Sequence, residues 1–202
     1  MAYRTVVAYW LLTVAAVPAF ANVGAARATV TAARDDEARL ERGEVVVLTM
    51  ARHGRSGTAT AAVRIRAPIT RVWGVMTDCA RAPEFVPKLR ACRVLERHAD
   101  GRLVEHRVKP FSLLPELDYR FEEHWEEPRR IDFHRVGGDL AAMEGSWKLE
   151  PSDENDTLVR YTITIDPGFP VPGWYLQRAI RQDLVRLLGA LRDRVERGGE
   201  TP

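Results

Sequence analysis

Apolar and polar residues alternate along most of this chain, in segments that short polar turns separate. The last segment shows the pattern clearly, because Val159 and Tyr161 fall on one side while Arg160 falls on the other. A period of two residues is typical of strands with one buried face. Successive strands joined by short turns, such as Asp100 and Gly101, predict an antiparallel meander with one apolar face.

A long amphipathic helix is predicted at the end of the chain, from about Trp174 to Arg197. Its apolar residues recur at steps of three and four, which makes a stripe wide enough to lie across a sheet. A shorter helix is expected after Pro68, where the segment ITRVWGVMTDCA has helical spacing. These elements predict an α+β fold in which a curved antiparallel sheet of about seven strands, preceded by one extra strand, surrounds the long helix.

The first residues have the features of a signal peptide. A positive charge at Arg4 precedes an apolar run that ends in Ala19, Phe20 and Ala21, the small-x-small pattern of a cleavage site. The run is shorter than the roughly 20 residues of a spanning helix. We therefore expect an exported protein, periplasmic or extracellular, with an uncleaved membrane anchor as the alternative. The expected divisions are a signal peptide at 1–21, or to 28 at a second candidate site, an N-terminal extension with an extra strand at 29–56, and a ligand-binding domain at 57–198. Between residues 29 and 42 the extension is polar, and we expect one loose helical turn there.

Export bears on the state of the two cysteines of the sequence, Cys79 and Cys92. An oxidising compartment permits them to form a disulfide. Sequence spacing does not fix the distance between their Cα atoms. A disulfide and two separate buried thiols therefore both remain open.

Four short motifs occur in the same order as the expected elements: IRAPITRVWGVMTD, APEFVPKLRACRVLE, GSWKLEP and PVPGWYLQRAIRQDLVRLLGALRDRVE. Together with the order of the elements, they resemble the START-like helix-grip (SRPBCC) superfamily, which includes the Bet v 1-type allergens. Within it, the motifs are similar to the coenzyme Q-binding START-domain and polyketide cyclase–dehydratase branch. The resemblance implies an apolar cavity between the helix and the sheet, for ligands such as quinones, lipids, polyketides or sterols. The resemblance also implies that the entrance of this cavity is lined by Phe85, Val86, Pro87, Phe169 and Trp174.

The candidates for the lining of this cavity are residues on the inward face of the strands and of the helix. Each of them has core packing as its alternative, because a helix on a sheet needs large side chains between the two. Tyr and Trp are the better candidates, since each carries a polar group on an apolar body. The set is Phe85, Val86, Tyr119, Phe121, Trp125, Phe133, Trp147, Tyr161, Trp174, Ile180 and Leu184.

Two ionisable residues share the inward parity of apolar neighbours: His106 and Glu123. A buried ionisable group is costly unless it is paired, so these residues are the candidates for holding a ligand headgroup or for acid–base catalysis. The alternative is that the strand ends are open to water. The motifs of nucleophilic hydrolases, metalloproteases and phosphate-binding loops do not occur, and we expect neither a metal nor a cofactor.

The net charge is +2, which does not favour nucleic acid as a partner. The function we expect is that of an exported protein that binds a small hydrophobic ligand, such as an isoprenoid quinone or a lipid. One alternative is a cyclase or dehydratase that uses His106 and Glu123 as acid and base. The other is an interaction module of the cell envelope whose arginines contact acidic lipids or a protein. Ligand identity and oligomeric state stay open at this point.

Overall fold

The computed structural model describes residues 22–110 and 115–198 of the chain, so the signal-peptide prediction for residues 1–21 lies outside the described residues. The chain divides after Asp35 into two compact units. Among the described helices, none is both long and apolar enough to cross a membrane. The elements are α1 (Asn22–Glu41), β1 (Val46–His53), β2 (Ser56–Ile65), α2 (Ile69–Thr77), the 3-10 turn η1 (Ala82–Glu84), β3 (Leu89–His98), β4 (Gly101–Val108), β5 (Leu117–Glu126), β6 (Arg130–Gly138), β7 (Ala142–Pro151), β8 (Thr157–Asp166) and α3 (Gly173–Arg197).

The eight strands form one antiparallel sheet in the order β1-β2-β8-β7-β6-β5-β4-β3. Strands β3 to β8 follow one another as hairpins, and β2 pairs with β8 to bring the beginning and the end of the meander together. The extra strand expected before Ser56 is β1, which pairs with β2 at one edge of the sheet. The predicted α+β fold is confirmed, with a strand count of eight.

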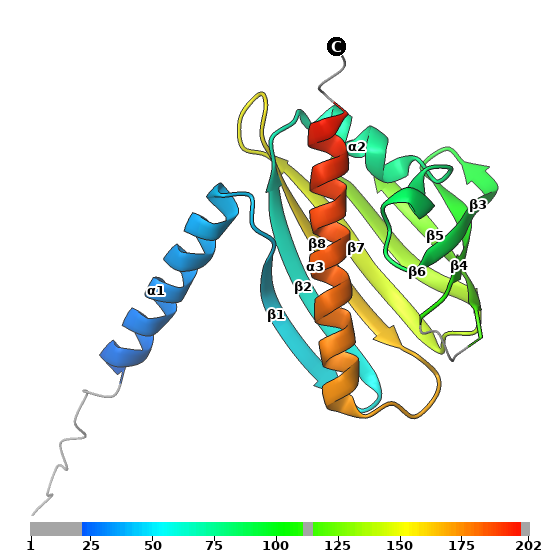
Figure 1. Cartoon of the computed structure of the whole chain (residues 1–202), viewed down its shortest axis with the longest axis horizontal. Coiled ribbons are helices and arrows are strands. Elements are labelled where there is room, and N and C mark those ends of the chain that lie inside the picture. Colours follow the sequence, from blue (N-terminus) through cyan, green and yellow to red (C-terminus); the bar gives the residue numbers. More distant parts are fainter. Residues whose placement is uncertain (1–21, 111–114, 199–202) are drawn as a thin grey trace, which may run out of the picture. The chain divides into compact units, whose positions relative to one another are not determined.

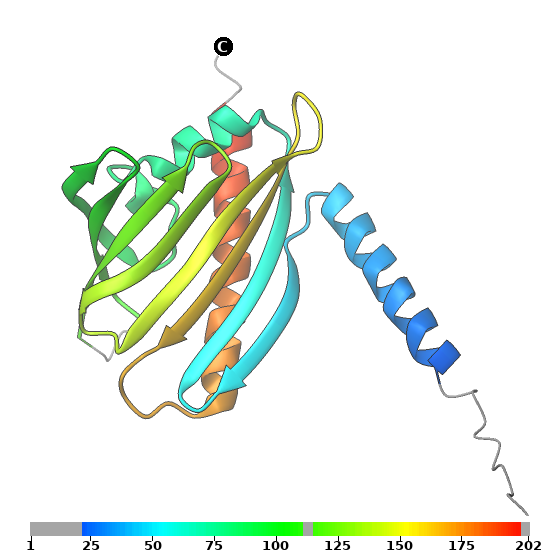
Figure 2. The ribbon, with the colours of Figure 1, turned by 180° about the vertical axis from the view of Figure 1, so that it is seen from behind.

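The helix α3 lies along one face of the curved sheet, as Figures 1 and 2 show from opposite sides. It begins after Pro172 and ends at Gly198, whose N–H bonds to the carbonyl oxygen of Arg194. Its buried residues follow the predicted stripe and pack into the main core with the inward residues of the strands. They are Leu176, Ile180, Leu184, Leu188, Leu191 and Val195.

The region before β1 is more helical than its sequence pattern indicated. One loose turn was expected between residues 29 and 42, whereas α1 spans 20 residues. Frequent alanine and the absence of proline explain the longer helix, since alanine has the highest helix propensity. Within the second unit, the end of α1 contacts β2 in two ways. Glu37 accepts a hydrogen bond of 2.9 Å from Arg64, and Leu40 packs against Ala62 in a small buried cluster.

Candidate ligand-binding pocket

A pocket of about 340 Å³ lies between α3 and the inner face of β4 to β8. Residues of β1 and β2 do not line it in the described chain, because the helix packs directly on β2. Small side chains permit this approach: Ala59 and Ala61 are fully buried, and a Cβ added at Gly57 would lie 2.6 Å from Cδ1 of Ile180. Large aromatic side chains on the other half of the sheet face α3 across the pocket.

An aromatic row forms the floor of the pocket across several strands. Phe121 and Phe133 are 6.1 Å apart between ring centroids, and Phe133 and Tyr161 are 6.0 Å apart. Tyr161 stacks on Trp147 at 3.9 Å. Gly145 permits this arrangement, because a Cβ at its position would lie 2.6 Å from Cζ of Phe133. The glycine of the GSWKLEP motif therefore makes room for a ring from the neighbouring strand.

His106 and Tyr119 form a hydrogen-bonded pair in the pocket wall, with Nδ1 and the hydroxyl oxygen 3.3 Å apart. The imidazole also lies edge-on to Phe121, with centroids 4.8 Å apart. Burial, and to a lesser degree the positive charge of Arg102, lowers the pKa of His106 from 6.5 to about 4. The histidine is therefore neutral at physiological pH.

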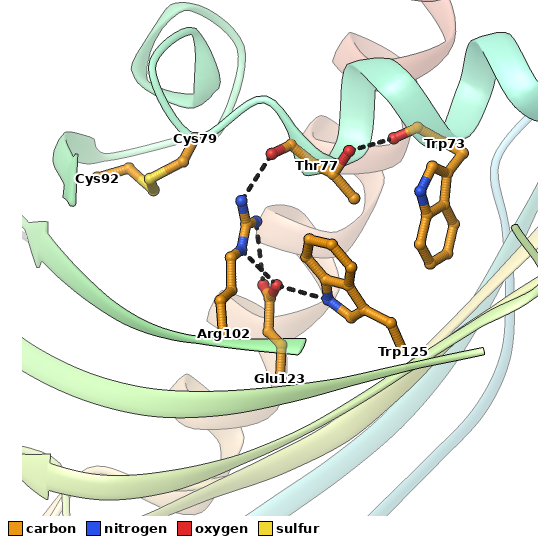
Figure 3. A network of polar contacts seen from close by, with 7 residues as sticks. All are labelled: Trp73, Thr77, Cys79, Cys92, Arg102, Glu123 and Trp125. Carbon is orange, nitrogen blue, oxygen red and sulfur yellow. Dashed lines mark hydrogen bonds and ion pairs between the residues drawn. A yellow bond between two sulfur atoms is a disulfide. The ribbon is translucent and has the colours of Figure 1, made fainter. Parts of the chain in front are cut away.

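Glu123 lies in the pocket wall as its parity indicated, but it is engaged by two partners (Figure 3). Arg102 donates from Nε to its Oε2 over 2.7 Å, and the indole N–H of Trp125 donates to the same oxygen over 3.0 Å. Arg102 also donates to the carbonyl oxygen of Thr77 at the end of α2, over 2.7 Å. No hydrogen bond joins Glu123 to His106 in the described chain, so the two do not form an acid–base pair with each other.

Arg102 is the residue of this site that sequence reasoning missed. It is 4% exposed and lines the pocket from β4. Its signal was present, because Arg102 shares the inward parity of Val104 and His106 and opposes Glu123 in the β4–β5 register. The sequence analysis considered His106 and Glu123 as inward ionisable residues but not Arg102, which the glutamate on the next strand pairs with.

The segment between α2 and β3 borders the pocket with Phe85, Val86 and Pro87. Cys79 and Cys92 form a disulfide with a Cα–Cα distance of 5.4 Å, which resolves the choice that the sequence left open. Lys88 donates from Nζ to Oδ2 of Asp183 on α3 over 2.8 Å. This lid segment, residues 78–88, is therefore tied to β3 by a covalent bond and to α3 by an ion pair.

Three of the residues expected in the lining lie elsewhere. Trp125 turns toward α2, where its ring meets Trp73 at 5.8 Å and its N–H binds Glu123. Trp174 is 70% exposed, because it lies outside the apolar stripe of α3, and the next residue, Tyr175, lines the pocket instead. Leu184 is buried in the helix–sheet core. The other eight residues line the pocket: Phe85, Val86, Tyr119, Phe121, Phe133, Trp147, Tyr161 and Ile180.

Residues 65–192 match the family model described as polyketide cyclase / dehydrase and lipid transport. The chain belongs to this family. The match covers the segment from the end of β2 to the last turns of α3, which includes every pocket residue named above. The resemblance to the START-like superfamily is thereby confirmed. No curated protein matches the sequence.

Solved structures with the same fold include an aromatase/cyclase, Zhui, from Streptomyces sp. R1128, with 17% identity and a TM-score of 0.64, over 72% of this chain and 97% of that one. A START superfamily protein from Mycobacterium smegmatis has 22% identity and a TM-score of 0.62, over 69% and 97%. A STAR-related lipid transfer protein from Xanthomonas axonopodis has 16% identity and a TM-score of 0.60, over 73% and 98%. At these identities the likeness concerns the fold alone.

Proposed function

We propose that this protein is an exported binding protein that holds a small hydrophobic molecule, such as an isoprenoid quinone or a lipid, in the pocket under α3. The observation that carries the proposal is the pocket itself. Its volume of about 340 Å³ lies within the range of small-molecule sites. Its lining is mostly aliphatic and aromatic, so burial of an apolar ligand would drive binding at roughly 25 cal/mol per Å² before the costs of association.

Export is supported by the N-terminal sequence and by the disulfide. Disulfides persist mainly in oxidising compartments, and the bond between Cys79 and Cys92 is consistent with one. Cell fractionation followed by N-terminal sequencing of the mature chain tests this part. A chain that begins after Ala21 or Ala28 and is found outside the cytoplasm is the expected result; a full-length chain in the cytoplasm would contradict it.

A cyclase or dehydratase that uses His106 and Glu123 is the alternative, and the geometry supports it less. Oε2 of Glu123 accepts two hydrogen bonds, and Oε1 lies 3.4 Å from Nη2 of Arg102. A histidine with a pKa of about 4 is a weak base at neutral pH. A filled core would have favoured the interaction-module alternative, and the pocket weighs against it.

Native mass spectrometry of the protein purified from its own cells, followed by organic extraction, tests the binding function. We expect a co-purifying apolar molecule. Ala179 lines the pocket from α3, so Ala179→Trp should fill it and abolish co-purification. Val185 on the same helix is 41% exposed and outside the lining, so Val185→Trp is the matched control and should retain the ligand. Equal loading of both variants would reject the pocket as the binding site.

A further inference from the structure

We propose that the pocket selects ligands whose polar end is an uncharged hydroxyl or carbonyl group, and that it discriminates against free carboxylates and phosphates. The inference rests on the proposed binding function and narrows its ligand class. Three features of the pocket carry it: the pairing of its charges, its unpartnered polar atoms, and the cost of burying an anion among them.

The charged side chains of the pocket neutralise one another. Four of them line it in the described chain, and they form two ion pairs: Arg102 with Glu123 at 2.7 Å, and Lys88 with Asp183 at 2.8 Å. The first pair is nearly buried, with side chains 5% and 11% exposed. Since each cation already has a carboxylate, an anionic ligand would have to displace a protein carboxylate to gain a counterion.

The polar atoms that remain for a ligand are uncharged. Tyr161 is 7% exposed and lines the pocket, and its hydroxyl has no hydrogen-bond partner in the described chain. The indole N–H of Trp147, stacked on Tyr161, has none there either. His106 and Tyr119 bind each other through one ring nitrogen, which leaves Nε2 of the imidazole for a ligand.

A ligand that fills the pocket excludes water from the hydroxyl of Tyr161, so a ligand oxygen that accepts its hydrogen bond replaces the bond to water that is lost. Burial raises the pKa of Tyr161, and also that of Tyr119, so both phenols stay protonated and can donate. A ketone, quinone or alcohol oxygen can accept such a bond without bringing charge into the apolar floor. A carboxylate would bring a charge whose desolvation no unpaired cation offsets.

Competition against Nile red, a neutral fluorescent probe, tests the selectivity with four molecules of equal chain length: dodecane, dodecanol, dodecanone and dodecanoate. The mature protein, as isolated from the cells, is used at neutral pH. We expect dodecanol and dodecanone to bind at least about tenfold more tightly than dodecanoate, because a neutral hydrogen bond replaces an uncompensated charge. Dodecanoate binding as tightly as dodecanol would overturn the inference.

Two kinds of variant separate the contributions. Tyr161→Phe should weaken dodecanol and dodecanone about three- to tenfold while leaving dodecane unchanged. An equal loss for dodecane would mean that the hydroxyl only supports packing, which would overturn its role. Glu123→Gln removes the carboxylate that pairs with Arg102 and should raise the affinity for dodecanoate, whereas Glu122→Gln on the outer face should not.

The competition experiment gives different results if the proposed function is wrong and if only the proposed selectivity is wrong. If neither Nile red nor any of the four molecules binds, the proposed function falls and the selectivity with it. If all four bind with equal affinity, the pocket is a ligand site without the proposed preference. Tighter binding of the two neutral oxygen-containing molecules supports both.

Discussion

At the scale of single residues, loss of the contact between Arg102 and Glu123 should lower the stability of the fold markedly. Glu123→Gln leaves a nearly buried guanidinium without its counterion, which we expect to lower the free energy of unfolding by about 3 kcal/mol or more. Urea denaturation measures the loss. Glu122→Gln on the same strand is the control, because that side chain is 48% exposed, and it should change stability by less than about 0.5 kcal/mol. Equal losses in both variants would show that the buried pair carries no special stability.

His106 should make the stability of the protein depend on pH. Its pKa is about 4 in the folded protein and 6.5 as a free side chain, so below pH 6.5 the unfolded chain binds a proton that the folded chain does not. Protonation therefore favours unfolding, and stability falls as the pH drops from 6.5 toward about 4, by about 2 to 3 kcal/mol in total.

The measurement is the urea midpoint as a function of pH for the wild type and for His106→Gln. The difference between the two curves isolates the histidine, because carboxylates titrate in both proteins. We expect the variant to lose less stability across this pH window. Parallel curves would show that His106 is accessible enough to be protonated in the folded state.

At the scale of elements, the disulfide fixes the lid segment between α2 and β3. Replacing Cys79 and Cys92 by alanine should lower the free energy of unfolding by about 3 kcal/mol, because the bond closes a loop of 13 residues in the unfolded chain. Denaturation with and without a reducing agent measures the same quantity in the wild type. A reducing agent that leaves the wild-type midpoint unchanged would argue against the bond, as would two reactive thiols in the unfolded, unreduced chain.

The elements themselves could be predicted because each is encoded locally. Period-two alternation marked the strands, and a stripe at steps of three and four marked α3, so the helix-on-sheet fold followed from patterns that hold over ten or more residues. The helix α1 was underestimated because a polar, alanine-rich segment has helix propensity but little apolar periodicity.

The pocket lining was harder to predict by the same reasoning. The alternation of residues tells which face of the sheet a residue lies on, but it does not tell which neighbours its side chain contacts. Phe121 and Trp125 share a face of β5, yet only Phe121 reaches the pocket, since Trp125 turns toward Trp73 on α2. Arg102 was missed for a related reason. Its inward parity could be read locally, but its burial depends on Glu123, a partner on another strand that parity alone does not identify.

At the scale of the whole molecule, the pocket joins elements that are far apart in the sequence: the lid segment, the inner face of β4 to β8, and α3 from Tyr175 to Leu191. A ligand that binds there must contact all of them, so binding should stabilise the domain as one body. An occupant that binds only the folded state adds about 2.7 kcal/mol at one hundred times its dissociation constant.

Hydrogen exchange with dodecanol as the ligand shows where this stabilisation acts. We expect slower exchange in the lid segment and in the first turns of α3, because both line the pocket outside the sheet, while the strands opposite are already protected by sheet hydrogen bonds. The β1–β2 hairpin turn does not line the pocket and should exchange at an unchanged rate. Protection confined to this hairpin, or absent from the lid segment, would place the ligand outside the pocket and leave the disulfide with a purely structural role.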